Sequence, residues 1–145
     1  MAIKIKFCGG VREVTGSSHL VSSPKSNILL DCGIFYGHRD EFYEVNTTFS
    51  YKTHLLDAVV LSHAHIDHCG NIPSLIKKGL RSRVFSTTAT RELCRLMLAD
   101  SGKVQEEDIY YLNKVNRKLG IPLRTPLYTE NEGLRAIKRF RGIYY

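Results

Sequence analysis

The sequence contains no long apolar run. None of its segments reaches the roughly 18 consecutive apolar residues that a membrane-spanning helix requires, so we expect no contact with a membrane. Residues 3–8 alternate apolar and polar side chains as a strand does, and the start lacks the charged segment and apolar block of a signal peptide. The expected location is therefore the cytoplasm.

Closely spaced cysteine pairs, internal repeats and low-complexity tracts are missing as well. The four cysteines lie far apart and form no CxxC pair (Cys8, Cys32, Cys69 and Cys94). Reduced thiols in a reducing compartment explain this pattern better than a disulfide framework does. With 145 residues and no obvious linker, the chain has the length of one domain.

Negative charge is scarce in the second half of the chain. The net charge is +7, and residues 73–145 carry 15 Lys and Arg against 7 Asp and Glu. A basic half of this kind suits a polyanionic partner such as RNA or DNA. The alternative is that these side chains only solvate helix faces, and charge alone does not decide between the two.

Hydrophobic patterning predicts a mixed α/β fold. Short apolar or alternating runs predict strands at residues 3–8, 19–22, 27–30, 57–61 and 83–87. Apolar residues at helical spacing predict helices at residues 72–79, 91–100, 106–119 and 129–140. In the second of these helices we expect Leu93, Leu96 and Met97 to face the core. Residues 34–56 are rich in aromatic side chains without clear periodicity, and we expect loops there.

Three of the six histidines crowd into one turn. His63, His65 and His68 lie with Asp67 within six positions, directly after the apolar run at residues 57–61 and just before a helix start. Open α/β sheets bind their ligands at such carboxyl ends of strands. The two remaining histidines after residue 30, His38 and His54, have no ligand-like neighbours, and we expect them at the surface.

A divalent metal ion explains why these four side chains lie together. Neutral imidazole and carboxylate are good zinc ligands, whereas unpaired groups of this kind are costly to desolvate. In an extended chain His63 and His65 point to the same side and can bind one ion, which leaves Asp67 and His68 to face a second ion about 3.5–4 Å away. The alternative is a solvated polar turn, which explains neither the density nor the spacing of these residues. Cys69, although adjacent, is not expected to be a ligand.

At these residues the sequence resembles a known family. Residues 63–70 read HAHIDHCG and are similar to the HxHxDHxG signature of the metallo-β-lactamase fold. The resemblance implies that His63 and His65 bind one zinc ion and that Asp67 and His68 bind a second. It also implies that a water activated by the two ions attacks the substrate.

Asp31 follows the strand predicted at residues 27–30. From the pattern alone, it either accepts the ring N–H of a ligand histidine or caps its own backbone in a turn. Residues 29–33, LLDCG, resemble the first conserved motif of the metallo-β-lactamase fold. The resemblance implies the first role, so Asp31 and Asp67 are the residues expected to act in catalysis.

The flanking segments resemble one branch of the family, the β-CASP nucleases, which process RNA or, in some members, DNA. The resemblance is carried by residues 10–20, 31–37, 88–108 and 126–130, and so covers essentially the whole chain. It implies an αββα sandwich in which two sheets pack face to face between helices.

The chain also departs from that branch. Its members continue with a further metal-binding histidine, an aspartate that bridges both ions and a β-CASP domain, but no histidine follows His68 and no aspartate follows Asp108 here. We therefore expect residues 1–145 to form only the N-terminal half of the sandwich, a mixed sheet with flanking helices and one exposed apolar sheet face. With two ligands per ion, metal binding should be weak unless His19 or another chain contributes a ligand.

The sequence thus predicts a zinc-dependent hydrolase that cleaves RNA phosphodiesters but is incomplete as this chain. Basic residues are candidates for phosphate contacts (Arg91, Arg95, Lys114, Arg117 and Lys118). One alternative is a non-catalytic half that works with a complementing chain or as a homo-oligomer. Another is a hydrolase of small esters or thioesters.

Overall fold

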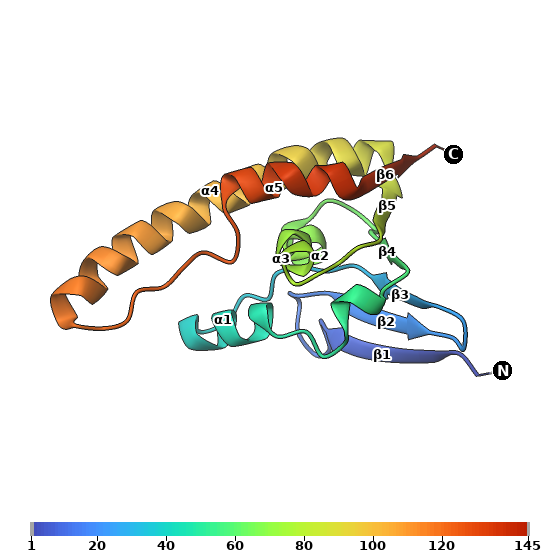
Figure 1. The fold of residues 1–145 in the computed structure, drawn as a ribbon, viewed down its shortest axis with the longest axis horizontal. Coiled ribbons are helices and arrows are strands. Elements are labelled where there is room, and N and C mark those ends of the chain that lie inside the picture. Colours follow the sequence, from blue (N-terminus) through green and yellow to red (C-terminus); the bar gives the residue numbers. More distant parts are fainter. Residues whose placement is uncertain (1, 145) are drawn as a thin grey trace.

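Six strands form one mixed sheet in a computed structural model that describes residues 2–144. The strands are β1 (Lys4–Gly9), β2 (Ser18–Ser22), β3 (Asn27–Leu30), β4 (Ala58–Val60), β5 (Arg83–Thr87) and β6 (Phe140–Ile143). They lie side by side in chain order (Figure 1). The first three strands pair antiparallel, and β3 to β6 run parallel to one another.

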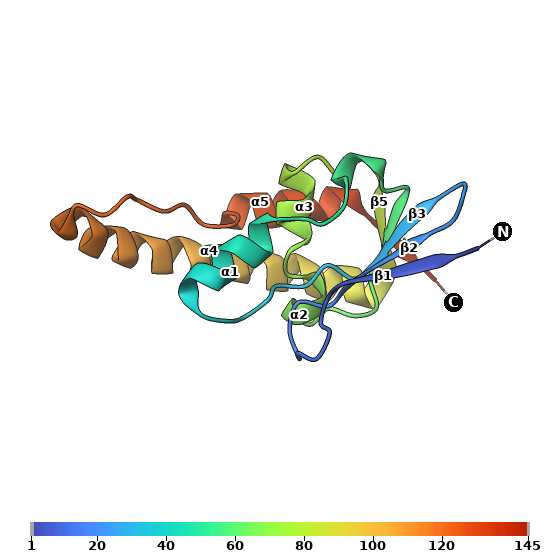
Figure 2. The same cartoon turned by 90° about the horizontal axis from the view of Figure 1, so that it is seen from below.

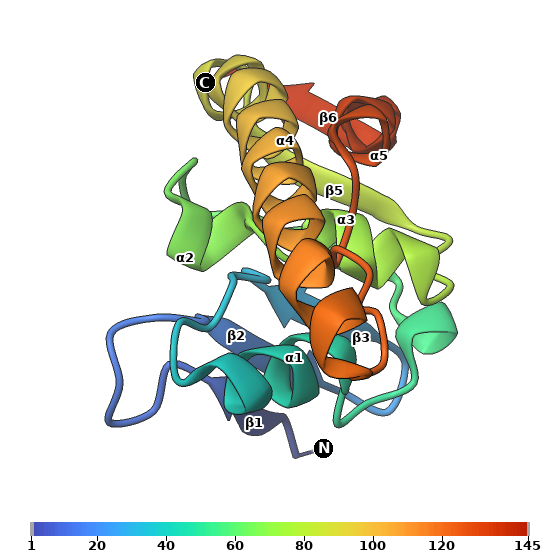
Figure 3. The same cartoon turned by 90° about the vertical axis from the view of Figure 1, so that its left-hand side faces the viewer.

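The helices lie in front of the sheet when it is viewed as in Figure 3, so they cover one of its faces. They are α1 (Arg39–Thr47), α2 (Ile66–Cys69), α3 (Ile72–Lys77), α4 (Thr88–Leu119) and α5 (Glu130–Ala136), with the 3₁₀ turns η1 (Thr53–Leu55) and η2 (Ile137–Arg139). None of the helices between residues 2 and 144 is both long and apolar enough to cross a membrane.

The core lies between this helical layer and the sheet. Leu29, Val59 and Val84 stand next to one another on three parallel strands and are completely buried. Leu75 of α3 and Leu98 of α4 belong to the same buried cluster. The core therefore holds β3, β4 and β5 firmly at the place where the metal turn begins.

The opposite face of the sheet is apolar and open, as the sequence predicts. Phe7, His19, Leu30 and Val60 pair in one row across four strands. Phe7, Leu30 and Val60 are exposed large hydrophobic residues, and so is Ile5 in the neighbouring row. Residues 2–144 thus form one sheet with helices on one side.

The two helices predicted at residues 91–100 and 106–119 are one continuous helix, α4. Gly102 lies within this helix. A side chain does not fit at this position, because a Cβ would come 2.6 Å from the Thr129 carbonyl, where α5 approaches. The core-facing stripe is Cys94, Leu98 and Gly102, so the expectation that Leu93, Leu96 and Met97 face the core is wrong. The buried residues Cys94 and Leu98 each lie one position after Leu93 and Met97.

Two elements differ further from the sequence prediction. The helix expected at residues 129–140 ends at Ala136, and the chain then turns into β6, which adds a parallel strand beside β5. The expected loop at residues 34–56 contains α1. The side chain of Asn46 holds α1 in place, because its amide donates to the Phe35 carbonyl and its oxygen accepts the Phe35 N–H.

Candidate metal centre

The histidine-rich turn lies where the parallel strands β3 and β4 end. The Asp31 N–H, directly after β3, donates to the carbonyl of Val60, the last residue of β4, at 2.9 Å. Helix α2 follows within a few residues, with His65 as its N-cap. In Figure 2, α2 lies beside the loop that joins β1 to β2, and the Ser17 N–H of this loop donates to the Asp67 carbonyl at 2.9 Å.

The segment after β3 is hydrogen-bonded along the backbone of this turn. The Cys32 N–H donates to the His68 carbonyl at 2.8 Å, and the Ile34 N–H donates to the Ile66 carbonyl at 3.1 Å. Between them, Gly33 comes so close that a Cβ would lie 1.6 Å from the Asp67 carbonyl oxygen. The LLDCG segment therefore fixes the backbone from which the histidines project.

Asp31 is the centre of the side-chain hydrogen bonds. Its Oδ1 accepts the Ser62 N–H at 2.8 Å, and its Oδ2 accepts from the Ser62 hydroxyl at 2.9 Å and lies 2.8 Å from Nδ1 of His68. The backbone of Asp31 has a φ of +58°, a conformation that residues other than glycine rarely adopt. Backbone strain of this kind persists only where the surroundings enforce it, and here strand pairing and hydrogen bonds do so.

The four expected ligands face one another as two pairs. Nε2 of His63 lies 3.0 Å from Nδ1 of His65, and Nε2 of His68 lies 3.6 Å from Oδ2 of Asp67. Two donor atoms bound to one tetrahedral zinc ion, each about 2.0–2.1 Å from it, lie about 3.3 Å apart. The donor set therefore fits a divalent ion in chemistry and in spacing, two donors at a time.

A third donor for either pair is not found in the part of the chain that the structure describes. No group of three His, Cys, Asp or Glu side chains among residues 2–144 could hold a metal ion. His19, which the sequence offered as a substitute, packs its ring edge-on against Phe7, with 5.4 Å between ring centroids. The two pairs nevertheless adjoin, because the ring centroids of His63 and His68 are 4.1 Å apart.

Cys69 points away from the donor pairs. Its side chain is fully buried, and its Sγ donates to the Ala64 carbonyl at 3.3 Å. A hydrogen bond with Cys94, followed by burial, raises the pKa of the Cys69 thiol. The thiol therefore stays protonated within the core.

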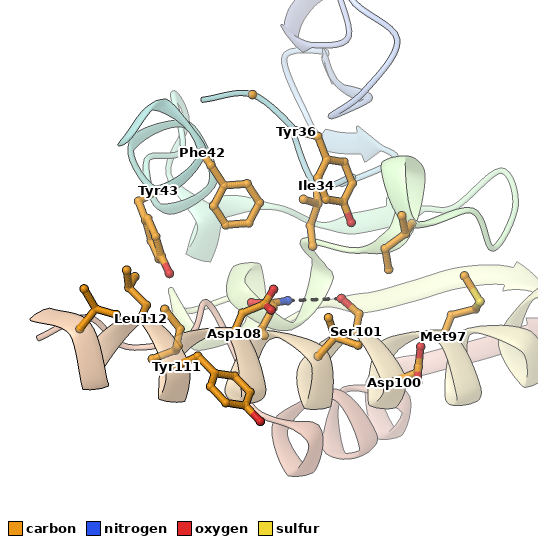
Figure 4. Close-up of a pocket in the computed structure, with 16 residues that line it drawn as sticks. Ile34, Tyr36, Phe42, Tyr43, Met97, Asp100, Ser101, Asp108, Tyr111 and Leu112 are labelled. Carbon is orange, nitrogen blue, oxygen red and sulfur yellow. Dashed lines mark hydrogen bonds between the residues drawn. The ribbon is translucent and has the colours of Figure 1, made fainter. Parts of the chain in front are cut away.

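A groove with a volume of about 860 Å³ runs from the metal turn along α4 (Figure 4). Tyr36, Phe42 and Tyr43 line one wall, and residues of α4 that include Asp108 and Tyr111 line the other. Ile66, between two of the expected ligands, also lines the groove. Burial raises the pKa of the Tyr36 hydroxyl, and the negative charge of Asp67 in the metal turn raises it further. No local sequence pattern predicts this groove, because its walls are far apart in the chain.

The basic residues suggested for phosphate contacts all lie on α4 (Arg91, Arg95, Lys114, Arg117 and Lys118). Arg91 pairs with Glu92 at 2.8 Å. The last three lie toward the end of α4 that projects away from α2 in Figures 1 and 2. The structure thus does not bring these five together at the metal turn.

Residues 11–79, which include this arrangement of donors, match the model of the metallo-β-lactamase superfamily. A metallo-β-lactamase domain implies binding of a divalent metal ion. A solved subclass B3 metallo-β-lactamase from a soil metagenome, MEM-A1, superposes with a TM-score of 0.50 and 20% identity over 97% of this chain and 43% of its own. That likeness shows the fold alone.

Three proteins illustrate what this chain is similar to in sequence. Ribonuclease TTHA0252 of Thermus thermophilus is 39% identical over 112 residues, which are 77% of this chain and 26% of the relative. Transcription termination factor FttA of Methanocaldococcus jannaschii is 36% identical over 115 residues, 77% of this chain and 18% of the relative. Integrator complex subunit 11 of Danio rerio is 34% identical over 107 residues, 70% and 18% respectively. The chain thus spans about a quarter or less of the length of these relatives.

Proposed function

We propose that this chain carries the first metal ligands of a zinc-dependent nuclease that hydrolyses RNA phosphodiesters. The observation that carries the proposal is the meeting of two donor pairs, His63 with His65 and Asp67 with His68, at the ends of parallel strands. The name of the ribonuclease relative supports RNA as the substrate.

Each pair would hold one zinc ion. An ion held by these pairs would supply Lewis-acid chemistry: it would polarise the scissile phosphate and lower the pKa of a water, so that a nucleophile would be available near neutral pH. Asp31 holds the ring of His68 through its Nδ1 and so leaves Nε2 directed at Asp67. The side chains of this chain thus bind and orient, while the third ligand that a catalytic zinc site usually has must come from elsewhere.

The groove beside the metal turn suits the bases of single-stranded RNA. Exposed aromatic rings stack bases of any sequence, with about 1–3 kcal/mol per base. Tyr36 offers such a ring in one wall, and Tyr111 offers another at the edge of the groove, where its ring points away from Tyr36 in Figure 4. Asp100 and Asp108 also line the groove, and their charge repels phosphates. The sugar–phosphate backbone would therefore run along the rim, with bases turned inward.

A second candidate function is that of a non-catalytic half-site, which becomes active only when another polypeptide segment supplies the missing ligands. Two observations favour it: each donor pair lacks a third donor among residues 2–144, and one apolar face of the sheet is open. Such polypeptide could belong to a complementing chain or to a second copy.

Incubation of the purified chain with end-labelled single-stranded RNA and Zn²⁺ tests the proposal. Slow cleavage that EDTA and Asp67→Ala both abolish supports it, and cleavage that survives either change contradicts it. Hydrolysis of a phenyl ester or thioester without RNA cleavage would favour the small-molecule alternative. Absence of any hydrolysis, together with zinc binding that depends on Asp67, would favour the half that needs further polypeptide.

A further inference from the structure

The hydroxyl of Ser62 lies between the carboxylate of Asp31 and the ring of His63. Its Oγ is 2.9 Å from Oδ2 of Asp31 and 2.9 Å from Nδ1 of His63. The place of Ser62 directly before His63 is the one signal in the sequence that points to this contact.

The single hydroxyl hydrogen decides the direction of both hydrogen bonds. An ionised carboxylate can only accept, so the Ser62 hydroxyl donates to Asp31. Its oxygen is then left to accept, and the partner at Nδ1 of His63 must donate a hydrogen. His63 is therefore held as the Nδ1–H tautomer, with the lone pair of Nε2 directed at His65, 3.0 Å away.

His68 is fixed by the same carboxylate oxygen without an intermediary. Its Nδ1 lies 2.8 Å from Oδ2 of Asp31 and donates to it, which leaves Nε2 as the acceptor on the side of Asp67. One carboxylate thus sets the ring of a histidine in each donor pair, directly for His68 and through a serine for His63.

We propose that Ser62 is a positioning residue that relays the charge of Asp31 to His63 and so keeps Nε2 of His63 free for a metal ion. This inference rests on the proposed metal site. Hydrogen-bond partners of ligand histidines typically change metal affinity about 10- to 100-fold when they are removed. Ser62 is exposed, so its truncation removes little packing, and the Ser62 N–H still donates to Asp31 after the change.

The test is the tautomeric state of the histidines in the metal-free protein, read from ¹⁵N chemical shifts of the imidazole nitrogens. In Ser62→Ala we expect His63 to shift toward the Nε2–H tautomer while His68 stays Nδ1–H. Ser62→Thr restores the hydroxyl and should restore His63. Ser17→Ala is the matched control, because the Ser17 hydroxyl lies 3.5 Å from the same Asp31 oxygen, and it should leave both histidines unchanged.

Zinc affinity, measured by competition with a chelating dye, is the second readout. Ser62→Ala should weaken binding at least tenfold, and Ser62→Thr should stay within about threefold of the wild type. His63 remaining Nδ1–H in Ser62→Ala would overturn the proposal, and so would Ser62→Thr binding as weakly as Ser62→Ala. The tautomer readout needs neither metal nor RNA, so a failure of the proposed nuclease activity would leave it intact.

Discussion

Gly33 and Asp31 show how single residues shape the metal turn. Gly33 leaves no room for a side chain against the Asp67 carbonyl, and Asp31 adopts a positive φ that its hydrogen bonds maintain. The four expected ligands could be predicted because they are neighbours in sequence, although their role as ligands stays a prediction. The contribution of Ser62 could not be predicted, because it depends on the meeting of the ends of β3 and β4.

Gly33→Ala should destabilise the protein strongly. The new methyl group overlaps the backbone of the metal turn, so we expect the free energy of unfolding in urea to fall by about 3 kcal/mol or more and zinc affinity to fall with it. Gly120→Ala is the control, because Gly120 has a φ of +67° but no atom within 4 Å of the added Cβ. It should cost about 1 kcal/mol and spare zinc binding. Equal losses in the two variants would contradict this account of Gly33.

Among the helices and strands, the central parallel strands were predictable and the peripheral elements less so. Each of β3, β4 and β5 contributes a fully buried aliphatic residue to the core (Leu29, Val59 and Val84), and this local apolar pattern predicts a strand. By contrast, β6 is a strand only because β5 offers it a free edge, and its short sequence continues a helical pattern. Helix α1 is only nine residues long and is held by Asn46, a contact that no local pattern reveals.

The start of α5 should make stability depend on pH. Thr129 and Glu132 form a capping box, and Lys77 pairs with Glu132 at 3.0 Å. Partial burial raises the pKa of Glu132, but the hydrogen bonds from Thr129 and Lys77 outweigh it and lower the pKa overall. The carboxylate therefore stabilises the fold above its ordinary pKa, and this contribution is lost as the pH falls through the lowered value.

Glu132→Gln tests this dependence by chemical denaturation at several pH values. The variant should be less stable than the wild type at pH 7, and the difference should shrink as the pH falls below about 4. Glu130→Gln, in the same first turn but outside the capping box, is the control and should show a smaller change. A difference between wild type and Glu132→Gln that stays constant from pH 7 to pH 3 would rule out this origin.

The groove between α1 and α4 makes a prediction for RNA binding. Tyr111→Ala should weaken binding of single-stranded RNA at least fivefold in fluorescence anisotropy, because one stacking platform is lost. Tyr110→Ala is a closely matched control: both tyrosines are 66% exposed, and Tyr110 does not line the groove. Equal effects of the two substitutions would argue against RNA bases in this groove.

For the protein as a whole, the open face of the sheet is the dominant surface feature. Its apolar residues come from several adjacent strands and form one continuous patch, and patches of this kind mark assembly or aggregation sites. The sequence predicted this face from the resemblance to a two-sheet fold. What else contacts the face could not be predicted from these residues, among which Phe7 and Ile5 are more than half exposed.

Phe7→Lys should reduce self-association of the purified chain and its binding of an apolar fluorescent dye. Leu96→Lys is the control, because Leu96 on α4 is 69% exposed, close to the 65% of Phe7, but lies outside the sheet. Sedimentation velocity and dye fluorescence report the two effects. If Leu96→Lys reduced self-association and dye binding more than Phe7→Lys does, the surface responsible for association would lie on α4 instead.

The decisive measurement is the zinc content of the purified chain after equilibrium dialysis, determined by elemental analysis for the wild type and for His65→Ala/Asp67→Ala. The double variant removes one donor from each pair, and the exposed residues His38 and His54 provide the control His38→Ala/His54→Ala. We predict up to two zinc ions per chain in the wild type and in the control, and none in His65→Ala/Asp67→Ala. Unchanged zinc content in that variant would contradict the assignment of the metal centre.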